Sequence, residues 1–488
     1  MKRFYIDTLA NLKSSQPLTI IATPETWREA LLACHITGDT FDMAQAMLSN
    51  HECKSITLYR KCSDCEHPVR LSVVVLAPTQ SRDMPHQNVF ALQKLLKDEH
   101  FSGENAAIAV FLKSHESMAY AAVTAEIVKA CPIFTRKTEK QESEVKISLI
   151  CHTEDTVLCQ AICDIIPETA RWVDTPTLEM TTENFEDEAL AFAQKYNLKA
   201  QVIAETELQN KGFGGLWHVG KSGKTMPRMV ILEYAHPESN MHHIALVGKG
   251  LVYDTGGLCL KPREHMATMK SDMGGAAAVL GAILMASILK LECKITAILC
   301  IAENGIGPDA LRPDDIIKLY SGLTVEINNT DAEGRLVLGD GVAYASKDLN
   351  PDVIIDMATL TGAQLMCTGK RHAGLLTPDA WIQDLIVDAG KACGEPVYPL
   401  LYAPEILFSE FKSDTADMKN SCKDRLNAQS SCAGHFVEKH LNKDWHGKYA
   451  HIDIAGPAWN GERATGYGAL LLVAIASNPN LTWSPEAE

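Results

Sequence analysis

The sequence predicts an α/β protein of two domains. A smaller N-terminal α/β domain is expected over residues 1–165, and a C-terminal domain with a central, mostly parallel mixed sheet covered by helices over residues 166–488. Two observations predict this organisation. A chain of 488 residues is too long for one ordinary hydrophobic core. Strand-like segments also alternate with helix-like segments, which is typical of a parallel sheet covered on both faces.

The N-terminal domain is predicted from seven segments of alternating type. The expected strands are Ile56–Tyr59, Leu71–Leu76, Ala107–Leu112 and Val145–Ile150. The expected helices are Thr26–Leu32, Val89–Lys97 and Tyr120–Lys129. The charged stretch Arg136–Glu144 is predicted to be a surface loop. A helical pattern over Thr156–Trp172 is ended by Asp174-Thr175-Pro176, which marks the approach to the second domain. No catalytic constellation occurs before this point.

The C-terminal domain alternates more clearly. The expected strands are Met229–Tyr234, Ile244–Val247, Ile295–Ile301, Val325–Asn328, Val353–Asp356 and His451–Ile454. The expected helices are Met273–Leu291, Arg335–Lys347, Ile382–Cys393, Ser430–Leu441 and Tyr467–Ser477. Binding sites in such sheets form at the carboxyl ends of the strands. We therefore look for polar residues between a strand and the following helix.

Composition narrows the function classes. A formal net charge of -16 argues against nucleic-acid binding, which needs basic patches. The longest apolar run, Ala276–Leu289, is shorter than the ~20 residues of a membrane span and is predicted to be a buried helix. The first 20 residues lack the apolar core of a signal peptide. The 15 scattered cysteines are typical of reduced core residues in a cytoplasmic protein.

Two stretches combine many charged groups with glycines and apolar flanks. One runs from Val247 to Pro262 and continues through Lys270–Gly275, and the other is Asn329–Arg335. Lys249 and Asp254 bracket a glycine at one strand end, and Asp272 opens the helix near Met273. Asp331 and Glu333 follow another strand, and in extended backbone their spacing points both side chains the same way. Buried charges are costly unless they are paired or bind metals, so these stretches predict a metal site or an acid–base site.

Other signals have weaker support. Helix caps and surface pairs would explain only one or two of these acids. Gly215–Ser222 fits the phosphate-loop pattern, but its flanks are not a strand and a helix, and a glycine-rich turn is preferred. His51, Cys53, Cys62 and Cys65 could form a structural zinc site, although their spacing is irregular. The pairs His242-His243 and Lys439-His440 are predicted to be surface or edge residues.

The residue types favour hydrolysis assisted by two metal ions. Carboxylates with no thiolate suit Mg, Mn or Zn, and four carboxylates exceed the needs of one ion. A lysine can be a ligand only as a neutral amine. A second, charged lysine could stabilise an oxyanion, and an arginine could hold an anion. The two stretches contain no histidine, so the general base stays open at this point.

Several motifs resemble those of the leucyl aminopeptidase (cytosol aminopeptidase) family. They are VGKGLVYDTGG, MKSDMGGAAAVLGA, NNTDAEGRLVLGDG and DMATLTGA. NTDAEGRL is a highly specific signature, and the resemblance covers Ala170 to about Ala476. The segments DMKNSCKDR, SSCAGHF and GERATGYG are similar to an animal branch of probable aminopeptidases. The resemblance implies a variable N-terminal α/β domain and a catalytic C-terminal domain.

The resemblance also implies a ligand set and catalytic roles. One ion would be bound by Lys249, Asp254, Asp272 and Glu333, and the other by Asp254, Asp331 and Glu333. Zinc is expected, with Mn²⁺ or Mg²⁺ as alternatives in the exchangeable site. Lys261 would stabilise the oxyanion, and Arg335 would hold a bicarbonate that acts as the general base. Lys270 receives no role.

Substrate and assembly follow from the same resemblance. Peptides with a free N-terminus would bind next to a pocket that includes Met269, Thr359 and Gly362. The segment Ala455–Ala458 departs from the family pattern, so the resemblance does not imply a preference for leucine. A homohexamer is implied, with an N-terminal domain that serves oligomerisation or substrate access. Two alternatives are kept: a catalytically silent binding or scaffold protein, and an ATP-dependent enzyme that uses Gly215–Ser222.

Overall fold

The computed structural model describes residues 2–11, 15–48, 54–61, 66–98, 106–112, 117–138, 143–149, 153–237 and 242–481. These residues form two compact units. The first consists of Met1–Glu168 together with Gly390–Pro396, and the second of Thr169–Ala389 together with Val397–Glu488. Both units contain a sheet and helices, as the predicted α/β class requires. His51, Cys53, Cys62 and Cys65 lie outside the described residues.

The first unit contains a six-stranded sheet in the order β1-β6-β5-β2-β4-β3. All neighbouring strands are parallel except β3, which is antiparallel to β4. The strands are β1 (Lys2–Asp7), β2 (Leu18–Ala22), β3 (Lys54–Arg60), β4 (Val69–Val75), β5 (Ala106–Phe111) and β6 (Ser143–Leu149). The helices are α1 (Trp27–Ala33), α2 (Asp39–Met47), α3 (Val89–Asp98), α4 (Ser117–Lys129) and the first part of α5 (Thr153–Asp174). The four predicted strands and three predicted helices are confirmed, whereas β1, β2 and α2 were not predicted.

A buried ion-pair network explains why a distant segment belongs to the first unit. Lys129 Nζ lies 3.2 Å from Glu126 Oε1 and 2.9 Å from Glu395 Oε1. All three side chains are almost fully buried. Buried charges must be paired, so Glu395 anchors Gly390–Pro396 within this unit.

The second unit contains an eight-stranded sheet in the order β15-β14-β17-β13-β9-β10-β8-β7. The four central strands β17, β13, β9 and β10 are parallel, and antiparallel neighbours flank them on both sides. The strands are β7 (Lys199–Ala204), β8 (Arg228–Ala235), β9 (His243–Asp254), β10 (Lys294–Asn304), β13 (Val353–Ala358), β14 (Ala373–Leu376), β15 (Val397–Pro399) and β17 (Lys448–Asp453). The mostly parallel mixed sheet is therefore confirmed.

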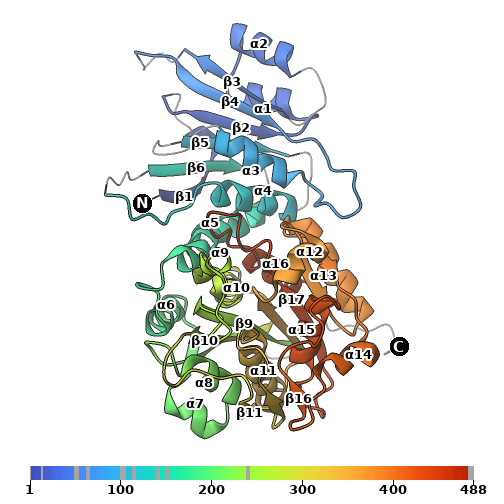
Figure 1. Ribbon diagram of the computed structural model, residues 1–488. Helices are drawn as coiled ribbons and strands as arrows, with labels where there is room; N and C mark the ends of the chain where they lie inside the picture. The colour runs from blue at the N-terminus through green and yellow to red at the C-terminus, as the bar shows by residue number, and fades with distance from the viewer. Residues whose placement is uncertain are drawn as a thin grey trace. The chain divides into compact units, whose positions relative to one another are not determined.

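Helices cover both faces of this sheet (Figure 1). They are α6 (Thr182–Lys195), α7 (Thr206–Lys211), α8 (Gly214–Gly220), α9 (Arg263–Met266), α10 (Gly274–Leu289), α11 (Gly334–Tyr344), α12 (Gly362–Thr368), α13 (Ala380–Cys393), α14 (Pro404–Leu407), α15 (Gln429–Glu438) and α16 (Ala469–Ala476). A Cβ on Gly248 of β9 would come within 2.5 Å of Ala276 in α10. A Cβ on Gly341 of α11 would come within 2.5 Å of Val247. Val247 and Gly248 are neighbours on one strand and face opposite ways, so α10 and α11 pack on opposite faces.

Helix α10 is the buried helix that the apolar run predicted. It begins after the short 3₁₀ helix Met269–Met273 and packs against the sheet and α16. The span Met269–Leu289 is long and apolar enough to cross a membrane, but 83% of its most apolar 18-residue stretch is buried inside the fold. A core helix of a globular protein meets the same criteria.

Several predicted strand boundaries differ from the structure, and two of these differences affect the predicted site. The strand expected over Ile244–Val247 continues to Asp254, so Lys249 lies inside β9 and only Asp254 lies at its end. Its glycines are not strand ends: a Cβ on Gly248 would meet the backbone of α10, and a Cβ on Gly250 would lie 3.0 Å from the backbone oxygen of Cys300 in β10. The strand expected over Val325–Asn328 is the shorter β12 (Thr324–Glu326), in a separate three-stranded sheet with β11 (Ile316–Lys318) and β16 (Met418–Lys419).

Candidate metal centre

Lys249 is the most deeply buried charge of the predicted site. It lies on β9, and its Nζ is 2.8 Å from Asp272 Oδ2 and 3.1 Å from Glu333 Oε1. The same nitrogen donates a hydrogen bond to the backbone oxygen of Thr359 at 3.0 Å. A Cβ on Gly334 would lie 2.6 Å from this nitrogen. Because Gly334 of the signature motif has no side chain, it leaves the space that Lys249 occupies.

Asp254 ends β9 and is held by amide groups. Its Oδ1 accepts hydrogen bonds from Gly256 N and from Asn304 Nδ2, both at 2.8 Å. Gly256 and Gly257 have φ angles of +83° and +62°, and only glycine adopts this region readily. These two glycines turn the chain sharply after Asp254, toward Lys261.

Asp272 lies on the 3₁₀ helix Met269–Met273, directly before α10. Thr359 Oγ1 donates a hydrogen bond to Asp272 Oδ1 at 2.9 Å, while Oδ2 faces Lys249. Thr359 follows β13, so one threonine holds both a lysine and a carboxylate of the cluster. The predicted position of Asp272 at the start of the buried helix is confirmed.

Asp331 and Glu333 do not share an extended backbone, which corrects the predicted geometry. Asp331 lies in a turn, and Glu333 is the N-cap residue of α11 with helical angles of φ -79° and ψ -36°. Glu333 is buried, whereas the side chain of Asp331 is 34% exposed. The two carboxylates are brought to the cluster by a turn and a helix start.

Lys261 joins the two acids that Lys249 does not contact. Its Nζ lies 2.7 Å from Asp254 Oδ2 and 2.5 Å from Asp331 Oδ1. Its side chain is 14% exposed, compared with 2% for Lys249. The structure thus separates an enclosed lysine from one that reaches solvent.

Arg335 is in the first turn of α11, two residues after Glu333, and is buried. Its Nη1 donates to the backbone oxygen of Asn420 at 3.1 Å, and its Nε has no hydrogen-bond partner among the described residues. A buried guanidinium with an unused donor fits an anion ligand.

The oxygen atoms of the cluster fit a metal site. One oxygen each of Asp254, Asp272 and Glu333 lies within 4.8 Å of the others. Glu333 Oε2 is buried without a hydrogen-bond partner in the described part of the chain. Burial and then the charge of Glu333 raise the pKa of Asp254 to about 6. Burial raises the pKa of Asp272 to about 8, although Lys249 opposes this shift. Crowded carboxylates of this kind suit a hard divalent cation.

Of the predicted pocket residues, Met269 lies next to this cluster in the chain and Thr359 lies next to it in space, whereas Gly362 begins the helix that follows Thr359. Met269 begins the 3₁₀ helix that carries Asp272, and Thr359 contacts Asp272. A Cβ on Gly274 would lie 3.1 Å from Thr359 Cγ2 and 3.5 Å from Ala458 Cβ. Ala458, the small residue of the divergent segment Ala455–Ala458, and Thr359 therefore both lie beside Gly274. The pocket itself stays a prediction.

Two residues that sequence reasoning missed organise the site. Asn420 accepts hydrogen bonds from Asn328 N and Asn329 N and donates to Asn329 O and Ala332 O, at 2.6 to 3.3 Å. It thus holds the loop that carries Asp331 and Glu333. Asn304 Nδ2 bridges Asp254 and the backbone oxygen of Thr330. No local pattern marks either asparagine, because their partners are distant in sequence.

Lys270, which had no predicted role, holds the 3₁₀ helix to a distant segment. Its Nζ donates to the backbone oxygen of Asp174 and lies 6.0 Å from the ring centre of Trp459. The buried Asp174 carboxylate accepts from Ala464 N at 3.0 Å and pairs with Arg463 at 2.9 Å. Asp174 therefore connects the helix of Asp272 with the loop after β17.

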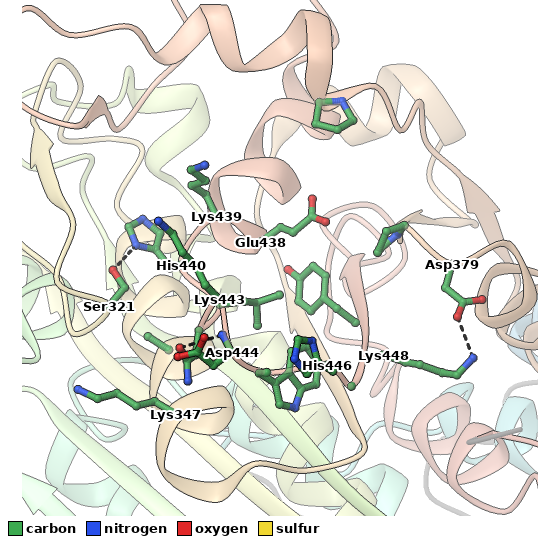
Figure 2. Close-up of a pocket in the computed structure, with 18 of the residues that line it drawn as sticks. Ser321, Lys347, Asp379, Glu438, Lys439, His440, Lys443, Asp444, His446 and Lys448 are labelled. Atoms are coloured by element: carbon green, nitrogen blue, oxygen red, sulfur yellow. Dashed lines mark hydrogen bonds and ion pairs between the residues drawn. The ribbon is translucent and has the colours of Figure 1, made fainter. Parts of the chain in front are cut away.

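The weaker sequence signals fall elsewhere. Gly214–Gly220 is helix α8, preceded by α7, so the expected turn was wrong and the strand–loop–helix context of a phosphate loop is absent from this described stretch. A separate cavity of about 1680 Å³ is lined by His440, Lys443 and Tyr402 among others, and by none of the predicted site residues (Figure 2). His440 was expected at the surface but is fully buried, and it bonds Ser321 Oγ at 2.7 Å.

Comparison with known proteins agrees with this geometry. Residues 168–473 match the model of the cytosol aminopeptidase family, catalytic domain. The chain is 42% identical over 452 residues to the probable aminopeptidase NPEPL1 of Mus musculus, which covers 90% of this chain and 84% of that protein. It resembles the structure of leucyl aminopeptidase from Trypanosoma cruzi with a TM-score of 0.89 at 36% identity, covering 98% and 96% of the two chains. The enzyme from Trypanosoma brucei, solved in complex with actinonin, gives 0.88 at 33% identity, with 97% and 95% covered.

Proposed function

The chain belongs to the cytosol aminopeptidase family of metal-dependent peptide-bond hydrolases, and we propose that its carboxylate cluster removes single residues from the free N-termini of peptides. The observation that carries this proposal is a cluster of three buried carboxylates, two of which pair with the buried Lys249 and the third with Lys261 at the solvent side. A scaffold protein would gain little stability from burying these charges, because even paired buried charges often fail to repay the free energy of their desolvation.

Two divalent ions are proposed to occupy the cluster. Lys249, Asp254, Asp272 and Glu333 would hold one ion, and Asp254, Asp331 and Glu333 the other. Zinc is the expected metal, and Mn²⁺ or Mg²⁺ the alternative at the exchangeable position. When bound, such ions supply Lewis acidity that activates water and polarises a carbonyl. Binding at Lys249 requires loss of its proton. Burial lowers the pKa of this lysine, but Asp272 and Glu333 outweigh burial and raise it, so the proton must be displaced by stronger positive charge.

Lys261 and Arg335 are proposed to have separate roles in the rest of the reaction. Lys261 keeps its proton, because Asp254 and Glu333 raise its pKa against the effect of burial. Its ammonium group would stabilise the oxyanion that develops at the scissile carbonyl. Arg335 would hold a bicarbonate through its unused Nε donor, and that anion would accept the proton of the attacking water. Asn420 supports both the anion-binding Arg335 and the loop that carries Asp331, because it contacts each of them.

The substrate's amino terminus is proposed to bind at the metals, with its first side chain near Met269, Thr359 and Gly362. Actinonin is a peptide-like ligand of the Trypanosoma brucei relative, which supports a peptide substrate here. Ala458 provides less bulk near Thr359 than a larger apolar residue would, so the pocket would also accept side chains other than leucine.

The proposal is tested with purified protein. Metal content, expected to be two ions per chain, is measured together with hydrolysis of a panel of aminoacyl anilides. Chelation should abolish activity, and Zn²⁺ or Mn²⁺ should restore it. Protein that retains two ions but cleaves no aminoacyl substrate would instead support the silent scaffold. An ATP-dependent enzyme would require nucleotide binding that Lys221→Ala abolishes.

We propose a cytoplasmic homohexamer, in which the first unit serves oligomerisation or controls substrate access. This follows from the family resemblance, and light scattering coupled to size-exclusion chromatography measures it directly. A monomer with full peptidase activity would refute the assembly without affecting the chemistry.

A further inference from the structure

Asp453 is a fully buried carboxylate at the carboxyl end of β17, and the proposed chemistry does not use it. Its Oδ1 accepts hydrogen bonds from Leu360 N at 3.0 Å and from Ala455 N at 3.1 Å. Its Oδ2 accepts hydrogen bonds from Thr361 N at 3.1 Å and from Thr361 Oγ1 at 2.7 Å. Each carboxylate oxygen therefore has two neutral donors.

The four donors belong to two loops that follow neighbouring strands. Residues 359–361, the first loop, follow β13, and residues 455–458, the second loop, follow β17. The strands β13 and β17 are parallel neighbours, so both loops leave the sheet at the same edge, where binding sites of such sheets form. Asp453 ties the two loops together at that edge.

A second buried side chain, Gln364 of α12, joins the second loop to the same region. Its Oε1 accepts a hydrogen bond from Gly456 N at 2.6 Å, and its Nε2 donates to the backbone oxygen of His372 at 2.7 Å. A Cβ on Gly456 would lie 2.6 Å from the backbone oxygen of Gly369. The second loop is therefore held closely against α12.

The tied loops carry residues that we expect around the first side chain of a substrate. Thr359 lies in the first loop, Gly362 begins α12 directly after that loop, and Ala458 ends the second loop. Thr359 Cγ2 and Ala458 Cβ both lie beside Gly274. The separation of the two loops therefore decides how much room is left between Thr359 and Ala458.

The number of donors explains why residue 453 is an aspartate. A carboxylate offers two oxygens and no donor, whereas an asparagine side chain has one oxygen and an NH₂ group. In Asp453→Asn, that NH₂ group must face either the N–H groups of Leu360 and Ala455 or the N–H group of Thr361. In both orientations, at least one backbone N–H of the first loop loses its acceptor.

From these contacts we propose that Asp453 is a positioning residue that sets the width of the pocket for the substrate's first side chain. It acts through Thr359 and Ala458 rather than by touching the substrate, and the inference rests on the proposed peptidase function. The backbone oxygen of Thr359 also accepts a hydrogen bond from Lys249. A general disturbance of the first loop would thus reach the metal centre and slow all substrates alike, whereas a wider pocket affects only substrates with a side chain.

The experiment compares a leucyl anilide with a glycyl anilide, which has no side chain to fill the pocket. In metal-loaded Asp453→Asn, kcat/KM for the leucyl anilide should fall roughly threefold to tenfold more than kcat/KM for the glycyl anilide, mainly through KM. The matched control is Asp340→Asn. Asp340 is equally buried and accepts hydrogen bonds from Leu216 N and Tyr320 N, both at 2.8 Å, and neither donor belongs to the two loops. The control should leave the ratio of the two kcat/KM values unchanged.

A milder pair of variants covers the case in which Asp453→Asn does not fold. Thr361→Val removes the hydroxyl that donates to Asp453, and Thr361→Ser keeps a hydroxyl at that position. The valine variant should shift the ratio in the same direction as Asp453→Asn, and the serine variant should retain the wild-type ratio. Metal content and melting temperature show whether each variant is folded and loaded.

Calorimetric binding of free leucine and free glycine gives the same comparison without turnover. A wild type that binds leucine more tightly than glycine but cleaves neither anilide would refute the proposed function, and the ratio of the two Kd values in Asp453→Asn would still decide the role of Asp453. Equal changes for the leucyl and glycyl ligands, a matching shift in Asp340→Asn, or a wild type without preference between the ligands would overturn the inference.

Discussion

Nζ of Lys249 lies 3.1 Å from Oε1 of Glu333, in the space that the glycine of the signature motif leaves free. The lysine comes from the middle of a central strand and the glutamate from the start of a helix. Because Asp272 also lies 2.8 Å from the same nitrogen, three separated segments of the chain converge at one buried point. Removing any one of them should disturb the ligand set that we propose.

Glu333→Ala should abolish activity through loss of metal. Glu333, like Asp254, is assigned to both ions, and its buried Oε2 has no hydrogen-bond partner among the described residues. We expect metal content to fall from two ions per chain to one or fewer, measured by plasma mass spectrometry after dialysis. Glu462→Ala, which changes an exposed glutamate, should retain both ions. A Glu333→Ala protein that keeps both ions would contradict the ligand assignment.

Lys261→Ala should separate metal binding from turnover. The side chain contacts Asp254 and Asp331 but reaches solvent, where a substrate carbonyl would lie. Loss of one oxyanion donor typically lowers kcat by roughly 10²–10³-fold. We expect this decrease in kcat while both ions are retained, and we expect a much smaller change in KM. Steady-state kinetics with an aminoacyl anilide measures both constants. An equal loss of metal in Lys261→Ala and Glu333→Ala would mean that the two roles are not distinct.

The sequence predicted the elements of the second unit well, because their long apolar runs are separated by polar connections. It also brought the two charged stretches together, since each follows a strand-like segment. It failed at β9, where Gly248 and Gly250 interrupt the apolar pattern although the strand continues. At those positions α10 and the neighbouring strand β10 approach β9 closely, which is a tertiary cause with no local signal. In the same way β2 was missed, because its five residues are buried on both faces and do not alternate.

The sequence predicted which residues form the site better than it predicted their geometry. Asp331 and Glu333 were expected in extended backbone just after a strand, but a turn and a helix start place them. Asn420 lies about ninety residues beyond the loop that it holds, and Asp174 lies 96 residues before Lys270. A single sequence contains no information on which distant residues pair. Residue types could therefore indicate the chemistry, whereas the supporting contacts required the structure.

Lys270→Met should weaken substrate binding more than catalysis. The side chain fixes the 3₁₀ helix of Met269 and Asp272 to the backbone of Asp174, and methionine keeps its bulk without the donor. We expect KM to rise several-fold, about the effect of a lost hydrogen bond to a charged group at a partly exposed site, with kcat changed less. Lys347→Met, at an exposed position, is the matched control. An unchanged KM would show that this contact does not position the pocket.

Acid should destabilise the second unit partly through His440. The imidazole is fully buried against Phe436 and bonded to Ser321. Burial, and then the charge of Lys439, lower its pKa from 6.5 to about 3. The unfolded chain therefore binds a proton near pH 6.5 that the folded protein rejects until about pH 3. The stability that the neutral ring contributes is present above pH 6.5 and is lost as the pH falls from 6.5 toward 3.

The measurement is the melting temperature between pH 8 and pH 5, with a chelator present so that metal release does not contribute. Over each pH unit below 6.5, one such group costs roughly 1.4 kcal/mol of unfolding free energy. That corresponds to a decrease of roughly 2–4 °C for a domain of moderate size. His440→Asn, which can still bond Ser321, should flatten the decline, and His446→Asn, at an exposed position, should not. Equal slopes in all three proteins would mean that His440 accepts a proton without unfolding, and that its burial is less complete in solution.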